Sequence, residues 1–311
     1  MVQRNCQSPH DPILTALSAV RSRRLPVAIA LLGATLPIPA FASQGVETMD
    51  VTTTEAAAPE TVYDDTWLSI GIGAAALPSY EGSDDTVVSP IPLIQGKIGP
   101  VRINPRPAGI ALDFVPKPES GPRLSGGLSL RYRANRTGDV RDEVVERAAE
   151  LDSALEVGPT IGVSFPGTIH GRDSLSLNLD TRWDVLGAHD GFVVEPNATY
   201  FSPLSRGIAV SLSVGAKFAD DNFADYYFSV DEADAAATGL PTFEAEGGLI
   251  NLNSALLVGF DLGGDLTDGG PAIFVAGGYT RLMRDAADTP FTSIRGSADQ
   301  FVGAVGFGYT F

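Results

Sequence analysis

Histidine is the side chain most often used for proton transfer near neutral pH, and the sequence contains three, at positions 10, 170 and 189. His170 stands in a turn-rich stretch, PGTIHGR, and His189 lies beside Asp190 in GAHDG. A general base must lie within hydrogen-bond reach of the group it serves, and the sequence offers no nucleophile that can be assigned to His189. We therefore interpret His189 as a polar loop residue and predict no catalytic residue and no enzymatic activity.

The most acidic stretch is ADDNFADYYFSVDEAD, residues 219–234, which holds six carboxylates and no basic residue. Carboxylate oxygens suit Ca²⁺, but the spacing lacks the order and the glycine of an EF-hand loop. DEAD at 231–234 imitates a helicase motif, yet no phosphate-binding loop accompanies it, since Gly96-Lys97 is followed by Ile98 rather than Ser or Thr. We interpret the stretch as a solvated loop, keep a divalent-ion site as the alternative, and predict no cofactor and no metal ligand.

Residues 1–42 have the layout of a secretory signal peptide. Three arginines precede an apolar run, and Ala40-Phe41-Ala42 ends it with a small residue on either side of the phenylalanine, so we predict cleavage after Ala42. An anchoring helix is the alternative, and the prolines within this short run argue against it. The single cysteine, Cys6, would leave with the signal, so the mature chain would have no disulfide and no thiolate metal site.

Charge narrows the class of partner. Loss of residues 1–42 removes four arginines and Asp11, which takes the formal net charge from −17 to −20. Nucleic acid is therefore excluded as a predicted partner, because binding to phosphates depends on Lys and Arg. Residues 43–65 are acidic, contain no basic residue and show no periodicity, so we predict a flexible periplasmic tail.

Most of the remaining sequence alternates between apolar and small or polar residues with period two, which is the pattern of β-strands with two different faces. In RLSGGLSLRY, residues 123–132, leucines and Tyr132 share one face, and arginines and serines share the other. The alternation predicts twelve strands, at about 66–77, 87–95, 99–104, 108–115, 123–132, 153–165, 174–185, 192–201, 208–218, 248–262, 271–284 and 300–311. If the two weak segments, 99–104 and 108–115, do not form strands, the alternative is a barrel of ten strands.

Two features favour a transmembrane barrel over a soluble β-sandwich. Aromatic residues fall at strand ends, as in the two interfacial girdles of a barrel in lipid. The less apolar strand face is charged, which suits a wet lumen. The first girdle would contain Phe114, Phe165, Tyr200, Phe260 and Tyr309, and the second Tyr132, Trp183, Phe218 and Phe301; the charged face carries Arg123, Arg131, Glu156, Asp180, Arg182, Asp184, Lys217 and Asp261.

The predicted fold is therefore all-β: a transmembrane antiparallel up-and-down β-barrel over residues 66–311, in the cell outer membrane. Long connections at 135–152, 219–246 and 285–298 alternate with short turns, and such barrels keep their short turns in the periplasm. An even strand number then places both termini in the periplasm. We expect the inward arginines and carboxylates to pair with one another and close the lumen.

The sequence ends in GAVGFGYTF, in which Phe307, Tyr309 and Phe311 share one strand face. A strand with an unpaired edge cannot remain in hydrocarbon, so we expect this last strand to pair with the first, near 66–77, and close the barrel. We also expect its aromatic end to be recognised by the barrel assembly machinery.

Four stretches resemble the MipA/OmpV family of outer-membrane proteins: GIGAAALPSYEGSDD at 71–85, ADDNFADYYFSV at 219–230, RLMRDAADTPFTSIRGSADQ at 281–300, and the closing GFGYTF. Their order and spacing extend the resemblance over about 62–311, with a departure at Thr289, where we would expect serine. The resemblance implies an outer-membrane β-barrel. For one branch of the family it also implies a scaffold that holds a lytic murein transglycosylase near a murein synthase, although no residue here can be assigned to that contact. Other members are treated as porin-like or as surface antigens.

Two functions from different classes remain open. The first is a structural or scaffolding barrel, in contact with outer-membrane lipid and with murein-remodelling enzymes through its periplasmic turns and tail. The second is a porin-like diffusion channel for small solutes. A barrel of about twelve strands is wider than one filled by side chains alone and narrower than an open porin. Paired inward charges would close it, so the sequence favours the scaffold.

Overall fold

The computed structural model describes residues 61–118, 120–138 and 140–311. The predicted signal peptide at 1–42 and most of the predicted tail at 43–65 lie outside the described residues. No helix within the described ranges is both long and apolar enough to cross a membrane.

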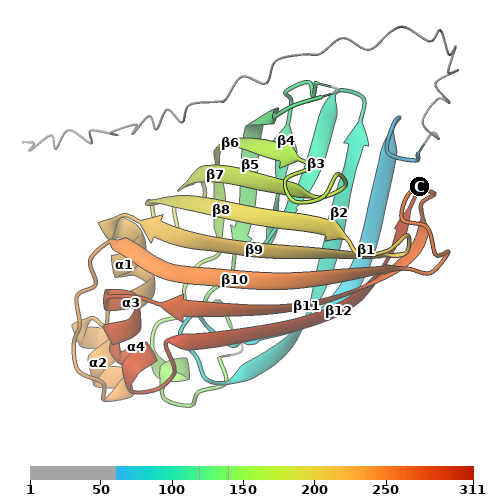
Figure 1. Cartoon of the computed structure of the whole chain (residues 1–311). Coiled ribbons are helices and arrows are strands. Elements are labelled where there is room, and N and C mark those ends of the chain that lie inside the picture. The colour runs from blue at the N-terminus through green and yellow to red at the C-terminus, as the bar shows by residue number, and fades with distance from the viewer. Residues whose placement is uncertain (1–60, 119, 139) are drawn as a thin grey trace, which may run out of the picture. The chain divides into compact units, whose positions relative to one another are not determined.

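Twelve antiparallel strands form a closed barrel in which each strand pairs with its neighbours in sequence and β12 returns to pair with β1 (Figure 1). The predicted topology and strand number are confirmed, and the two weak segments form the short strands β3 and β4. The strands are β1 (Trp67–Pro78), β2 (Thr86–Ile98), β3 (Val101–Arg106), β4 (Gly109–Asp113), β5 (Arg123–Arg133), β6 (Ala154–Pro166), β7 (Ser174–Asp184), β8 (Phe192–Pro203), β9 (Ile208–Ala219), β10 (Gly248–Asp261), β11 (Gly270–Leu282) and β12 (Asp299–Thr310).

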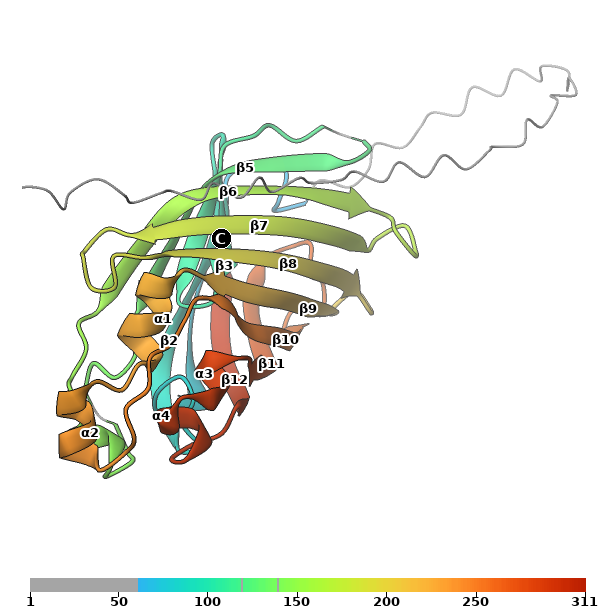
Figure 2. The same cartoon turned by 90° about the vertical axis from the view of Figure 1, so that its left-hand side faces the viewer.

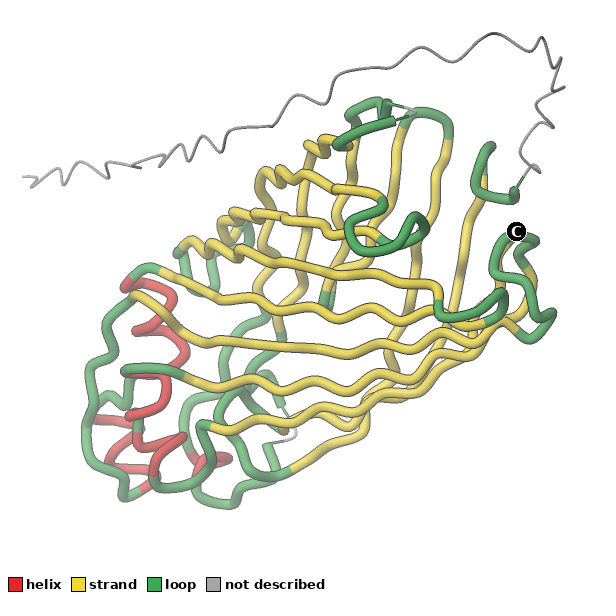
Figure 3. The backbone as a smooth tube through the Cα atoms, in the orientation of Figure 1, coloured by secondary structure: helices red, strands yellow, loops and turns green. Residues whose placement is uncertain are grey.

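The helices of the described residues all lie in connections at one end of the barrel, which we call the helical end. Figures 1 and 2 show α1 to α4 gathered there, and Figure 3 shows the same helices in red. In Figure 1 the C-terminus lies at the opposite end, which we call the turn end. The three predicted long connections belong to the helical end, as expected. Its helices are the 3-10 helix at Val145–Arg147, α1 (Asp221–Phe228), α2 (Glu232–Thr238), α3 (Asp285–Asp288) and α4 (Pro290–Ser293).

The outward face of the barrel is apolar. Ile72, Val88 and Val305 are each more than half exposed on it. Of the nine aromatic residues predicted to form the two girdles, eight are exposed. The ninth, Tyr200, is half-buried because its hydroxyl donates to Asp173 at 2.7 Å. This distribution is the one expected of a surface in contact with lipid.

The seam between β1 and β12 closes the barrel as predicted. The two strands pair from Ser69 with Thr310 to Ala76 with Gly303. Next to the pair of Ser69 with Thr310, at the turn end, the N–H of Phe311 donates to the carbonyl of Leu68 at 2.9 Å. On the inner side of the seam the ring of Phe274 lies against Gly306, where an added Cβ would come within 2.1 Å of the ring. Glycine at that position therefore lets the aromatic ring approach the backbone closely.

Candidate functional site in the lumen

Glu156 is the centre of a charged network inside the barrel. Its side chain projects inward from β6 and is fully buried. The Nε–H groups of Arg133 on β5 and Arg182 on β7 donate to its two oxygens at 2.7 and 3.2 Å. A buried carboxylate is costly unless it is paired and hydrogen-bonded, and these two guanidinium groups satisfy it.

Arg182 connects Glu156 to the rest of the network. Its side chain is almost fully buried, and it also donates to Glu195 on β8 and to the hydroxyl of Ser129 on β5, the latter at 3.2 Å. Arg131 donates to the other carboxylate oxygen of Glu195 at 2.7 Å. The network thus joins the inner faces of four successive strands, β5 to β8.

The short strand β3 reaches the same network through Arg106. The Nε–H of Arg106 donates to Asp180 on β7 at 2.8 Å. Asp180 also accepts from Ser129 at 3.2 Å and from Thr160. Because β3 and β7 are four positions apart in the barrel order, this contact is made between side chains in the interior and not between adjacent strands.

Glu81 brings the connection between β1 and β2 into the network. Its carboxylate accepts from Lys217 on β9 at 2.6 Å and from Asn251 on β10 at 3.3 Å, and it lies 3.4 Å from the Arg133 guanidinium. Burial pushes the pKa of Glu81 upward, but the charges of Lys217 and Arg133 outweigh burial and hold that pKa below its ordinary value. Glu81 is therefore bound as a carboxylate between two cations.

Helix α1 covers this network at the helical end. The Arg133 guanidinium lies 4.8 Å from the centre of the fully buried Phe223 ring, and the Lys217 ammonium lies 5.7 Å from it. Cation–π contacts of this kind stabilise cations that have lost their water. The apolar cluster around α1, which we call the cap core, contains Val193, Ala219, Phe223, Ala224, Tyr227, Phe228, Ala245, Ile250, Leu282 and Ala286.

His189 belongs to this cap. It lies in the connection between β7 and β8, as expected of a loop residue, but it is buried and not solvated. Its ring centre is 5.1 Å from that of Phe223, and its Nε2 is 3.6 Å from a Glu156 oxygen. Its Nδ1 accepts the N–H of Gly191 at 3.1 Å. His189 therefore packs the cap against the network. His170, in the turn between β6 and β7 at the turn end, lies 3.2 Å from the hydroxyl of Ser202.

The acidic stretch 219–234 is not the solvated loop predicted from its charge, because it folds into α1 and α2 over the mouth of the barrel. Asp220 caps α1 by accepting the N–H of Phe223 at 3.1 Å, and Asp231 caps α2 by accepting the N–H of Asp234 at 2.7 Å. Asp234 itself accepts the N–H of Ala149 at 2.8 Å. These carboxylates serve as helix caps and loop contacts.

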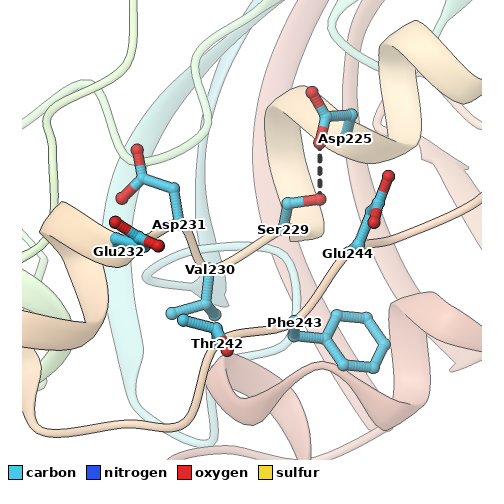
Figure 4. Close-up of a pocket in the computed structure, with 8 residues that line it drawn as sticks. All are labelled: Asp225, Ser229, Val230, Asp231, Glu232, Thr242, Phe243 and Glu244. Carbon is cyan, nitrogen blue, oxygen red and sulfur yellow. Dashed lines mark hydrogen bonds between the residues drawn. The ribbon is translucent and has the colours of Figure 1, made fainter.

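A pocket of about 430 Å³ lies beside α1 and α2. Figure 4 shows the residues that line it. One of its carboxylates, Asp225, accepts from the hydroxyl of Ser229 at 2.7 Å. In the part of the chain that the structure describes, no three His, Cys, Asp or Glu side chains are grouped to hold a metal ion. The pocket therefore gives no support to the divalent-ion alternative. Its lining residues are Asp225, Ser229, Val230, Asp231, Glu232, Thr242, Phe243 and Glu244.

Two polar contacts outside the network join the connections at the helical end. Arg295 donates to Asp142 at 2.7 Å, and the hydroxyl of Tyr80 donates to the carbonyl of Phe291 at 3.0 Å. Burial pushes the pKa of Asp142 upward, but the Arg295 guanidinium and the N–H groups of the following turn outweigh burial and hold it below its ordinary range. The connections before β6 and before β12 are therefore joined to the one before β2.

The charged residues predicted from sequence divide into two groups. Those near the helical end, Arg131, Glu156, Asp180, Arg182 and Lys217, meet in the network. Asp184 does not join it, because its carboxylate accepts the N–H groups of Leu186 and His189 at 3.0 and 2.9 Å. Arg123 and Asp261 lie at strand ends on the turn end, away from the network.

Sequence reasoning missed four charged members of the network, which are Arg106, Arg133, Glu195 and Glu81. Arg106 and Arg133 lie just beyond the predicted segments 99–104 and 123–132, and Glu195 is an inward position near the start of β8. Counting every second residue along these strands would have found all three. Glu81 lies in a connection, where the period of two stops. Nothing in its neighbourhood indicated that it turns into the barrel.

The apolar outer surface, the aromatic ends and the closed antiparallel topology define a β-barrel of the outer membrane whose lumen is covered at one end. Its sequence matches the model of the family described as MltA-interacting protein MipA over residues 70–311. The chain belongs to this family, as its motifs indicated.

Individual relatives and solved structures are more distant. A protein named "Putative outer membrane protein YiaT" from Escherichia coli O157:H7 is 24% identical over 224 residues, which cover 72% of this chain and 83% of that protein. The structure of an outer-membrane channel from Pseudomonas putida F1 has a TM-score of 0.41 and 15% identity, and covers 85% of this chain and all of the channel. The channel DcaP of Acinetobacter baumannii has a TM-score of 0.36 and 8% identity, over 79% of this chain and 96% of that one.

Proposed function

We propose that the protein is a non-catalytic scaffold of the outer membrane that holds murein-remodelling enzymes near the membrane. The observation that carries this proposal is the covered lumen: ion pairs cross the interior from β3 to β9, and the cap core lies over them. A barrel covered in this way is poorly suited to the free diffusion of solutes through its lumen. The parts left to contact partners are therefore the surfaces outside the lumen. The family description, an MltA-interacting protein, supports a murein transglycosylase as one partner.

In this proposal the mature chain begins after Ala42, and residues 43–65 form a periplasmic tail next to β1. Both chain ends lie in the periplasm with the turn end, and the helical end faces the cell exterior. The turns and the tail then form the surface available to a murein transglycosylase and a murein synthase. The placement follows from the general rule that outer-membrane barrels keep their short turns in the periplasm.

The orientation predicts where an inserted epitope can be reached. An epitope placed between Pro241 and Thr242 should be detected by antibody on intact cells. Both residues are exposed, so an insertion between them should be accessible. Ala235, earlier in the same connection, is a less suitable site because its N–H donates to the Asp231 carbonyl in the first turn of α2. A matched insertion between Gly264 and Asp265, in the turn between β10 and β11, should be detected only after the outer membrane is permeabilised. The reverse pattern would show that the barrel is inverted.

Two measurements test the scaffold itself. Cross-linking of intact envelopes followed by purification of the barrel should recover a murein transglycosylase, and purified protein in planar bilayers should show little conductance. Large and steady conductance that rises in proportion to salt, without a cross-linked murein enzyme, would establish the diffusion channel instead.

A further inference from the structure

The barrel is closed, but the strand pairing that closes it is short beside β2. β1 pairs with β2 along its whole length, from Pro78 with Thr86 to Trp67 with Lys97. On its other edge β2 pairs with β3 only over Gly96–Ile98, and no other helix or strand of the described chain packs closely against it. The edge from Thr86 to Gln95 therefore has no strand partner. β3 and β4 are six and five residues long, too short to cover it.

Two prolines occupy this free edge. Pro90 and Pro92 lie within the unbroken pairing of β1 with β2, opposite Ala74 and Ile72. Proline lacks an N–H, so it fits a paired strand only where that group would point away from the partner. Both prolines therefore present their N–H-free side to the unpartnered edge. This reduces the number of unsatisfied donors there and hinders the addition of a strand from a second copy of the chain.

Both faces of β2 are apolar along this edge. Val88 and Ile94 are exposed on the outward face. Ile91 and Leu93, in register with Gly73 and Gly71, lie on the inward face and are half-buried. A free edge at membrane depth is tolerated only where it is buried in protein or lines a water-filled cavity, so this edge is expected to border the lumen and not a continuous lipid-facing wall.

The interior beyond this edge has two different walls. The wall continuous with β2 is apolar, and the opposite wall is hydroxyl- and amide-rich. Leu257 and Val302 point inward by register yet are each 37% exposed, so side chains do not fill the space in front of them. The apolar wall carries Gly73, Ala75, Leu257, Phe274, Ala276 and Val302, and the polar wall carries Ser164, Ser176, Asn178, Asn197, Thr199 and Ser213.

We propose that the free edge of β2 is the rim of a lateral portal, through which an acyl chain of a bilayer lipid enters the lumen and lies on the apolar wall. The occupant is a lipid acyl chain because the portal opens into the hydrocarbon of the bilayer, while the cap core covers the entrance from the helical end. This role goes beyond the proposed scaffold and does not depend on it.

Single cysteines test the portal, because Cys6 is the only native cysteine. In the full chain with Cys6→Ser, a bimane fluorophore is attached at Ile91→Cys, on the inner face beside the portal. Ser213→Cys is the matched inner position at the middle of β9, and Val305→Cys is the outward position in contact with lipid. The proteins are reconstituted in phosphatidylcholine vesicles, with and without phosphatidylcholine that carries a nitroxide on its acyl chain.

The portal predicts that the label at Ile91→Cys loses nearly as much fluorescence to the nitroxide lipid as the label at Val305→Cys, while the label at Ser213→Cys loses little. Loss at Ile91→Cys no greater than at Ser213→Cys would overturn the proposal. So would quenching at Ile91→Cys by a water-soluble nitroxide alone. Leu93→Cys, the next inward position on β2, replaces Ile91→Cys if that variant does not fold.

Discussion

Replacing Arg182 by alanine is expected to destabilise the folded barrel by about 3–5 kcal/mol, the usual cost of removing one partner from a buried ion pair. Arg182 binds Glu156, Glu195 and Asp180 while almost fully buried. Without it, Glu156 keeps only one strong cationic partner in a site that water does not reach. A urea titration of the protein in detergent, followed by the heat-dependent mobility of the folded band on gels, measures the change.

The control is Arg206→Ala at the turn end. Arg206 pairs with Asp265 at 3.6 Å, but its side chain is 83% exposed. Surface pairs of this kind contribute about 0–1 kcal/mol, so this variant should unfold close to the wild type. Equal midpoints for Arg182→Ala and Arg206→Ala would show that the network does not hold the strands together.

Replacing Glu156 and Arg182 together, by glutamine and methionine, separates pairing from packing. The double variant removes the anion along with its cation, so no uncompensated carboxylate remains at the centre of the network. Partial recovery of stability relative to Arg182→Ala is expected, because the penalty comes mainly from the charge left behind.

The barrel was predictable because its physical constraint is periodic. A strand between lipid and lumen must change polarity at every residue, and β5 and β7 do so in RLSGGLSLRY and SLSLNLDTRW. β3 and β4 gave weaker signals because they are short. The segment SPIPLI in β2 has two prolines at alternate positions, and this pattern indicates a strand with one free edge.

The cap was not predictable from composition. Its acidic residues suggested a solvated loop, yet the buried residues Phe223, Ala224, Tyr227 and Phe228 recur at helical spacing within the same stretch. Helical periodicity was therefore present but was obscured by charge. The members of the network that lie on strands were predictable, because every second strand residue points inward. The position of Glu81 was not, because it depends on how the connection between β1 and β2 turns over the mouth of the barrel.

Deleting Phe311 is expected to remove most of the folded protein from the outer membrane. Its N–H donates to the Leu68 carbonyl at 2.9 Å, and its carbonyl accepts the Leu68 N–H at 3.3 Å, so it supplies the last main-chain pair of the seam. Its ring lies 4.7 Å from that of Tyr309, in the aromatic girdle at the turn end. Deletion leaves the Leu68 groups unpaired beside lipid, where such groups are costly, and removes an interfacial aromatic residue.

Two further variants separate these contributions. Phe311→Leu keeps the backbone pair and loses the ring, and Phe114→Leu removes a girdle aromatic that lies away from the seam. If closure of the seam dominates, both variants should reach the membrane in near-normal yield and only the deletion should fail. If recognition of the aromatic end by the assembly machinery dominates, Phe311→Leu should fail with the deletion while Phe114→Leu succeeds. Outer-membrane yield and heat-dependent gel mobility at matched low expression distinguish these outcomes, and normal yield of the deletion would show that neither the last pair nor the ring is needed for assembly.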